Sequence, residues 1–168
     1  MRPRLSIASR PKASSLLVRR RMQTAPRCDT QCELALRAIV HSLGLRYRVD
    51  CRLPGMRRRA DLTFIRERVA VFVDGCFWHG CPRHLTWPKA NADWWRDKLE
   101  SNRRRDADTN RQLRRAGWKV VRVWEHEDPL RASRRVVSAV REARLRIAGR
   151  DETVVATRRR NTQRHRLA

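Results

Sequence analysis

Residues 60–75, ADLTFIRERVAVFVDG, contain two β-strand patterns joined by a short charged segment. Apolar and polar residues alternate over residues 60–64, as in a strand with one buried face. Residues 69–73 are continuously apolar and mostly β-branched, which is typical of a central strand covered on both faces. The charged residues 66–68 between them predict a hairpin connection. The stretch therefore predicts two neighbouring strands of one sheet.

Further helix and strand patterns lie on both sides of this hairpin. Thr30 and Glu33 form a capping box at the start of a helical pattern, and Gly44 is suited to end that helix. The order of the elements predicts a mixed α/β sandwich. The remaining patterns are helices over residues 30–43, 92–116 and 128–147, and strands over residues 45–49 and 118–124.

The chain is strongly basic. Its 168 residues include 41 Lys or Arg and 17 Asp or Glu, which gives a formal net charge of +24. This length fits one domain, and the charge indicates a polyanionic partner, with nucleic acid first. The sequence has no apolar run long enough to span a membrane and no long basic helix with a strongly apolar face, so we expect no membrane partner. No apolar stretch suited to a signal peptide follows the basic N-terminus, so we expect a cytoplasmic protein.

The basic residues concentrate at the two ends of the chain. Residues 1–28 contain no acid and only scattered apolar residues, which indicates a basic N-terminal arm without structure of its own. Residues 148–168 are rich in arginine and predict a basic disordered tail. The packed domain is expected over residues 29–147.

Two carboxylates, Asp61 and Asp74, come from the two strands of the hairpin. Carboxylates brought to one end of a sheet can hold Mg²⁺, which supports phosphodiester hydrolysis. The same residues also fit a plainer interpretation, in which Asp61 is an exposed strand residue and Asp74 begins a turn before Gly75.

Cys76, Cys81 and His84 are spaced C-x4-C-x2-H, and His126 follows a later strand. Two thiolates and two imidazoles match the tetrahedral ligand set of a structural Zn²⁺ site. The alternative is two buried thiols and two surface histidines.

Other residues near this segment are candidates for chemistry. Phe77 and Trp78 are adjacent aromatics that either insert between bases or belong to the core. Histidine titrates near neutral pH, so His79 is either a general base or a structural hydrogen-bonding residue. Asp106 reads as a solvated helix residue, and Glu33 reads as the acid of the capping box.

Taken together, these residues resemble the very-short-patch mismatch repair endonucleases, the Vsr family. The segment 71–80, VFVDGCFWHG, carries the most specific part of the resemblance, which extends over about residues 22–128. The other matching positions are Asp29-Thr30 through Glu33, residues 60–62, Trp94-Trp95 through Lys98, Asn102, Arg105-Asp106, residues 116–118 and residues 123–125.

The resemblance implies a fold and a set of roles. The fold would be a PD-(D/E)xK restriction-endonuclease-like three-layer sandwich, with a mixed central sheet, flanking helices and a zinc-braced loop. Asp61 would bind Mg²⁺ together with the backbone carbonyl of Val73. His79 would help to activate the attacking water, Asp106 would orient it, and Glu33 would be an active-site residue.

The resemblance also implies how DNA is bound. Phe77, Trp78 and Trp95 would intercalate beside a T:G mismatch from the major groove, and Met22 in the N-terminal arm would enter from the minor-groove side. The arginines of the arm would lie along phosphates.

The sequence departs from the family pattern at two places. Asp74 stands where better-known members have His, so it would either add a metal ligand or replace the contact of that histidine to the scissile phosphate. The zinc loop is one residue longer, Cys and His are exchanged within it, and His126 stands where Cys is usual. All four positions keep competent ligands, so we expect a closed structural zinc site.

The implied function is a monomeric, Mg²⁺-dependent endonuclease. It would nick DNA on the 5′ side of the thymine in a T:G mismatch, the product of 5-methylcytosine deamination. MutL is a possible partner. Two alternatives stay open: a non-catalytic, arginine-rich, zinc-containing nucleic-acid-binding protein, and a restriction-type endonuclease on the same fold.

Overall fold

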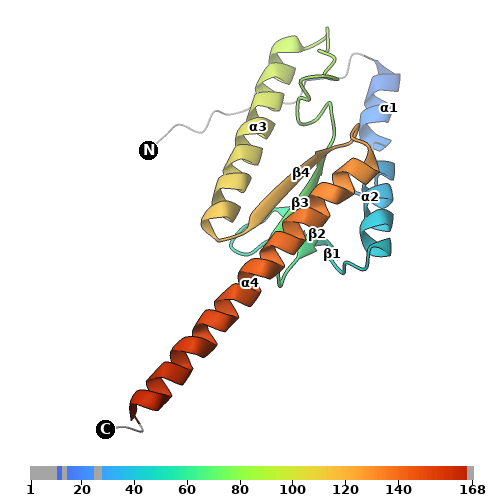
Figure 1. The fold of residues 1–168 in the computed structure, drawn as a ribbon. Helices are drawn as coiled ribbons and strands as arrows, with labels where there is room; N and C mark the ends of the chain where they lie inside the picture. The colour runs from blue at the N-terminus through green and yellow to red at the C-terminus, as the bar shows by residue number, and fades with distance from the viewer. Residues whose placement is uncertain (1–10, 13–14, 25–27, 166–168) are drawn as a thin grey trace, which may run out of the picture.

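Four strands form one mixed sheet at the centre of the protein (Figure 1). The computed structural model describes residues 11–12, 15–24 and 28–165, without the side chains of residues 18, 21–22 and 150–165. The predicted mixed α/β architecture is confirmed. The elements are α1 (Leu16–Thr24), α2 (Gln31–Ser42), β1 (Arg48–Arg52), β2 (Arg59–Phe64), β3 (Val69–Asp74), α3 (Ala92–Arg115), β4 (Lys119–Trp124) and α4 (Pro129–His165).

The sheet order is β1-β2-β3-β4. β1, β2 and β3 pair in an antiparallel manner, and β4 is parallel to β3. The predicted β2–β3 hairpin is present, with Leu62 opposite Val71 and Phe64 opposite Val69. β3 lies between β2 and β4 and is almost completely buried, as its apolar sequence predicts.

Helices cover both faces of the sheet, which gives three layers (Figure 1). On one face, Leu36 and Val40 of α2 and the apolar residues of α4 pack on β2, β3 and β4. On the other face, Leu113 of α3 packs with Phe72 and Trp118. The odd-numbered and even-numbered residues of β3 therefore enter different cores, because side chains alternate along a strand.

The start of α2 shows the predicted capping box. The Thr30 hydroxyl accepts a hydrogen bond from the Glu33 N–H and donates one to Glu33 Oε1. Glu33 Oε2 accepts a hydrogen bond at 2.9 Å from the N–H of Asp29, the residue before the cap. Glu33 is therefore fixed by local contacts at the end of its helix.

Some predicted boundaries differ from the structure. β1 begins at Arg48 rather than at residue 45, and Asp50 within it has a φ of 44°. The backbone turns at Asp50, where both the carboxylate and the carbonyl of this residue accept hydrogen bonds from Arg59.

The ends of the chain contain more helix than the sequence predicts. α1 lies within the segment interpreted as an unstructured arm, and α4 continues to His165 instead of ending near residue 147. No proline interrupts the sequence after Pro129, and the single Gly149 costs a helix only about 1 kcal/mol, so the helix continues into the predicted tail. Residues 1–10 of the arm lie outside the described residues. None of the helices in the described ranges is long and apolar enough to cross a membrane.

Candidate functional site

Asp61 and Val73 meet where the pairing of β2 and β3 ends. The last paired residues are Leu62 and Val71. Beyond this pair, the Val73 N–H donates a hydrogen bond to Asp61 Oδ2 at 2.7 Å instead of to a backbone carbonyl. In a strand, the N–H and C=O of one residue point to the same side, so the Val73 carbonyl is directed to the side on which Asp61 lies. Two oxygen donors of the kind that Mg²⁺ prefers are therefore available here.

The surroundings of Asp61 oppose its ionisation. Burial is the main cause, and it raises the pKa of Asp61 from its ordinary value of 3.8 to about 6. The Val73 hydrogen bond and the charge of Arg37 act in the opposite direction, whereas the neighbouring carboxylates of Glu33 and Asp74 raise the pKa further. Three carboxylates therefore converge at this end of the sheet, where a bound cation would relieve their mutual repulsion.

His79 lies between two carboxylates. Its Nδ1 is 2.6 Å from Asp106 Oδ2 and 3.5 Å from Asp74 Oδ1. Burial raises the pKa of Asp106, but the His79 hydrogen bond and the positive charge of Arg122 outweigh it and hold the pKa below its ordinary value. An ionised carboxylate only accepts hydrogen bonds, so Nδ1 of His79 carries the proton. Nε2 is then left as the basic nitrogen, which is the arrangement that a general base needs.

Arg122, in β4, binds both carboxylates that flank His79. Its Nε and Nη2 donate to the two oxygens of Asp74 at 2.6 and 2.7 Å, and Nη2 also lies 3.2 Å from Asp106 Oδ1. Burial lowers the pKa of Arg122, but Asp74 and Asp106 outweigh this effect and raise it. The group is thus a network of alternating charges that links β3, β4 and α3.

Glu33 reaches this region from α2 and is almost completely buried. Its Oε2 accepts a hydrogen bond from Arg37 Nη2 at 3.1 Å, in addition to the local contacts of the cap. Arg37 also binds Asp29. Glu33 therefore has its capping role and, through its charge, an influence on Asp61.

Cys76, Cys81 and His84, in the first part of the 75–91 loop that joins β3 to α3, come together with His126, which follows β4. One ligand atom from each lies within 4.8 Å of the others. Cys76 Sγ is 3.8 Å from His84 Nδ1, and Cys81 Sγ is 3.7 Å from His84 Nδ1 and 3.8 Å from His126 Nδ1. A tetrahedral zinc with ordinary Zn–S and Zn–N bonds separates its ligand atoms by about 3.3–3.8 Å. The donor set therefore fits Zn²⁺, and its atoms lie near this spacing, with Cys76 Sγ and His126 Nδ1 closer together at 3.0 Å.

The electrostatics of the two thiols indicate the same kind of ligand. Burial, followed by the neighbouring Cys81, raises the pKa of Cys76 to about 12. Although burial also acts on Cys81, the backbone N–H groups of Arg83 and His84 lower its pKa. A metal ligated by the two sulfurs replaces their protons, so a bound divalent cation would remove the cost that burial places on ionising Cys76.

The aromatic residues of the loop pack against α3. The ring of Phe77 makes edge-to-face contacts with Trp78 at 5.2 Å and with Trp95 at 5.0 Å between centroids. Trp95 is 7% exposed, whereas Trp78 is 39% exposed. Within this cluster of three rings, Trp78 therefore presents an accessible surface, while Trp95 is nearly buried against it. Met22 belongs to α1, and its side chain is not among those described.

Two residues of α3 fix the loop that carries these aromatics. Asn102 donates to the carbonyl of Trp78 at 2.8 Å, and Arg103 donates to the carbonyl of Gly80 at 2.8 Å. A Cβ at Gly80 would lie 2.5 Å from Arg103 Nη2, and the φ of 65° at this position also favours glycine. The loop is thereby fixed to α3 beside the Cys/His group.

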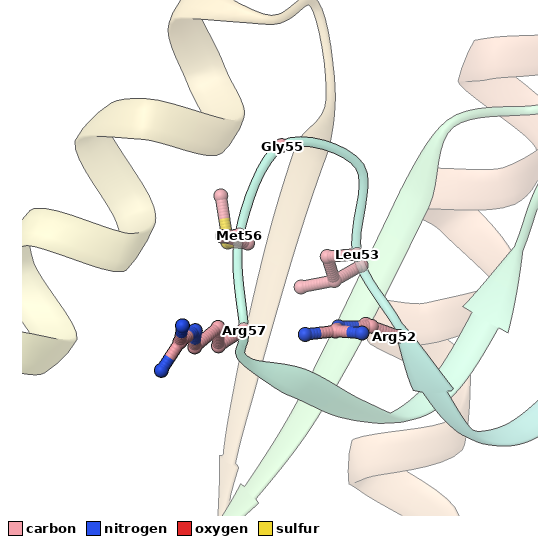
Figure 2. A pocket seen from close by; sticks show the side chains of 5 residues that line it. All are labelled: Arg52, Leu53, Gly55, Met56 and Arg57. Carbon is pink, nitrogen blue, oxygen red and sulfur yellow. The ribbon is translucent and has the colours of Figure 1, made fainter.

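A hollow of about 400 Å³ lies elsewhere, at the turn between β1 and β2 (Figure 2). It is lined by Arg52, Leu53, Gly55, Met56 and Arg57. None of these residues is an acid, a nucleophile or a ligand for Mg²⁺, so the hollow offers no groups for hydrolysis.

The structure thus brings together the candidate catalytic and Mg²⁺-binding residues that the sequence indicates. Asp61, Val73, Asp74, His79 and Asp106 lie at one end of the sheet. Arg122 was missed, because an arginine in an otherwise apolar strand reads as one exposed position. Its signal was the break in the apolar run Val120-Val121-Arg122-Val123, since a charge inside a buried strand needs a partner.

Comparison with known proteins agrees with this arrangement. The profile of the Vsr family, described as DNA mismatch endonuclease Vsr, matches residues 16–84. A type II nicking enzyme of Lentzea aerocolonigenes, V.NaeI, is 46% identical over 112 residues, which cover 65% of this chain and 68% of the relative. V.XorIIP, a type II nicking enzyme of Xanthomonas oryzae pv. oryzae, is 40% identical over 108 residues, or 63% of this chain and 77% of the relative.

The DNA mismatch endonuclease Vsr of Escherichia coli is also similar, with 35% identity over 99 residues that cover 58% of this chain and 62% of the relative. The matching residues include the β2–β3 hairpin and the start of the 75–91 loop, where the carboxylates and His79 lie. The chain is therefore an endonuclease and belongs to the Vsr family.

Proposed function

We propose that this endonuclease nicks one DNA strand on the 5′ side of the thymine in a T:G mismatch, in a Mg²⁺-dependent reaction. The observation that carries the proposal is that Asp61 and the ordered pair of His79 and Asp106 both lie at the end of β3, against Val73 and Asp74 respectively. The name of the Escherichia coli relative supports mismatched DNA as the substrate. Because the chain belongs to a family of endonucleases, the alternative of a non-catalytic nucleic-acid-binding protein is disfavoured.

The residues of this chain suggest how the reaction is arranged. Asp61 and the Val73 carbonyl would hold Mg²⁺, which supplies charge stabilisation for the phosphate oxygens during hydrolysis. His79 Nε2 would accept the proton of the attacking water, while the hydrogen bond from Nδ1 to Asp106 keeps the ring in the required tautomer. Cys76, Cys81, His84 and His126 would hold Zn²⁺ in a structural role, and this ion would take no part in the hydrolysis.

Recognition of the mismatch would begin at Trp78. Its partial exposure and its support by Phe77 and Trp95 are suited to a side chain that stacks on an unstacked base. We expect Trp78→Ala to reduce the preference for T:G over T:A by about tenfold, because one base stack contributes about 1–3 kcal/mol. Trp87→Ala is the matched control, since Trp87 is 50% exposed and lies in the same loop. Equal losses in both variants would contradict this role for Trp78.

The direct test of the function is a nicking assay on duplexes that carry T:G, T:A or C:G at one site. We expect one nick in the T:G duplex, only with Mg²⁺, and its loss in Asp61→Ala. Asp93→Ala is the control, because the Asp93 side chain is exposed and pairs with Arg96 on the surface of α3. Activity that survives Asp61→Ala would contradict the proposed chemistry.

The same assay tests the second candidate. The names of the type II nicking relatives favour a sequence-specific nick of restriction type. Equal cleavage of the T:G and T:A duplexes would support that function and overturn mismatch specificity. The monomeric state, a complex with MutL and a cytoplasmic location stay predictions.

A further inference from the structure

Arg122 is enclosed by contacts from three elements. Its Nε and Nη2 hold the two oxygens of Asp74, Nη2 also lies near Asp106, and Nη1 donates to Asn110 Oδ1 at 3.1 Å. The guanidinium carbon lies 5.0 Å from the centre of the Phe72 ring. Almost every donor of the guanidinium is thus engaged, and its side chain is only 21% exposed.

These contacts concern the carboxylates beside His79. Asp74 and Asp106 both lie within 3.5 Å of His79 Nδ1, so without a cation one buried and one partly buried negative charge would face one imidazole nitrogen. Arg122 pairs with both of them. Its planar fork can hold Asp74 through two parallel hydrogen bonds and still reach Asp106, whereas the single ammonium group of a lysine cannot reproduce that geometry.

The two carboxylates are thereby given different tasks. Asp106 keeps its hydrogen bond to His79 at 2.6 Å. Both oxygens of Asp74 accept hydrogen bonds from Arg122, whereas Asp61 accepts its hydrogen bond from the Val73 N–H at Oδ2. The geometry therefore favours Asp61 over Asp74 as a ligand for a hard cation.

From this arrangement we propose that Arg122 is a positioning residue of the nicking reaction. It holds Asp106 in place against His79. It also pairs with Asp74, so that Asp74 does not coordinate the catalytic metal. The expected kinetic effects rest on the proposed function. The protonation form and orientation of the His79 ring do not, because they can be measured on the protein without DNA.

The first experiment compares Arg122→Lys with the wild type on the T:G duplex. We expect kcat to fall about 100-fold while KM changes by less than about threefold, because a misplaced catalytic group costs about that factor without loss of DNA contacts. Arg58→Lys is the matched control, since Arg58 also joins the sheet side to α3, through Thr109 at 2.7 Å and Asp108 at 2.9 Å. Wild-type kcat in Arg122→Lys would overturn the proposal.

The second experiment asks whether Asp74 is a metal ligand. We measure the Mg²⁺ concentration that gives half-maximal nicking in the wild type and in the double variant Asp74→Asn/Arg122→Gln. We expect the two values to agree within about twofold, because the variant replaces an ion pair that does not bind the metal with a neutral pair of amides. An increase of tenfold or more would assign Asp74 to the metal and overturn this half of the proposal. The double variant removes both charges together, so it also serves if Arg122→Lys fails to fold.

The third experiment needs neither DNA nor Mg²⁺. Nitrogen-15 NMR of the histidine rings reports which nitrogen of His79 is protonated. We expect a single Nδ1–H form in the wild type and in Arg58→Lys, and a mixture of forms in Arg122→Lys. An unchanged single form in Arg122→Lys would contradict the positioning role. If the wild type fails to prefer T:G, the proposed function is wrong, and this measurement still decides the role of Arg122.

Discussion

Asp61 must be ionised to hold a cation, yet its surroundings favour the protonated form. In the folded protein its pKa is about 6, against an ordinary value of 3.8, chiefly because it is buried. The folded state therefore binds the Asp61 proton more tightly than the unfolded state. Without metal, this group destabilises the protein progressively as the pH rises from about 4 to about 6, and the penalty stays constant above that range.

Asp61→Asn should consequently abolish nicking but stabilise the metal-free protein. At pH 7.5 with a chelator of Mg²⁺, we expect the free energy of unfolding to rise by up to about 3 kcal/mol, since each pKa unit corresponds to about 1.4 kcal/mol. The amide oxygen can still accept the Val73 N–H. Thermal or urea unfolding at pH 7.5 and near pH 3.5 measures the effect, which should vanish at the lower pH.

Asp93→Asn is the control for this comparison, because the Asp93 side chain is 93% exposed. It should change stability by less than about 0.5 kcal/mol at either pH. A destabilised Asp61→Asn protein at pH 7.5 would show that Asp61 is not held at an unfavourable site.

The residues of the site were predictable to different degrees. Asp61 and His79 were candidates because of their residue types beside strand and loop patterns, but spacing left plainer interpretations open, and only the resemblance to the Vsr family gave them roles. The pairing of Asp74 with Arg122 was not predictable, because it joins residues 48 positions apart. Only the adjacency of parallel strands β3 and β4, which the sequence does not encode locally, brings them together.

Among the elements, the 75–91 loop is the one whose shape should depend on a bound ion. We expect about one zinc per chain in the purified protein and less than half of that in Cys81→Ser, with a lower melting temperature, because a structural metal contributes its binding energy to folding. Metal analysis and thermal unfolding measure these two quantities.

Cys51→Ser provides the matched control for the zinc loop, since Cys51 is a free, partly exposed thiol in β1, outside the Cys/His group. It should keep the zinc content and the melting temperature of the wild type. A zinc-free wild-type protein that unfolds like Cys81→Ser would contradict a structural metal.

The helices and strands have the predicted boundaries where the sequence pattern is long or where a residue such as glycine marks the end. β3 and α3 match their predicted ranges closely, because a fully apolar strand and a long helix closed by Gly117 leave little choice. α4 did not, since a helix with no proline after its first residue and only one glycine gives no signal for its end. The bend in β1 at Asp50 was also missed, because a positive φ at a non-glycine residue leaves no mark in hydrophobic periodicity.

At the scale of the whole molecule, α4 extends beyond the sheet and carries much of the C-terminal charge away from the site (Figure 1). The substitution Arg158→Gln/Arg159→Gln/Arg160→Gln lowers the formal net charge from +24 to +21, since 24 − 3 = 21. We expect the slope of log affinity for DNA against log salt to become shallower by up to about 2.7, with kcat at saturating DNA unchanged.

Salt-dependent binding assays measure that slope. A triple alanine substitution of the uncharged neighbours Asn161, Thr162 and Gln163 is the control, and it should leave the slope as in the wild type. A changed preference for T:G over T:A in the arginine variant would show that this part of the helix takes part in reading the mismatch rather than in general attraction to phosphates.

The bend at Asp50 bears on how the protein behaves at high concentration. β1 is an edge strand of only five residues. The free N–H and C=O groups of an edge strand can form hydrogen bonds with a strand of another chain. The turned backbone at Asp50 and the exposed charges of Arg48 and Arg52 make such pairing unfavourable. β1 therefore disfavours aggregation through the addition of further strands to this edge.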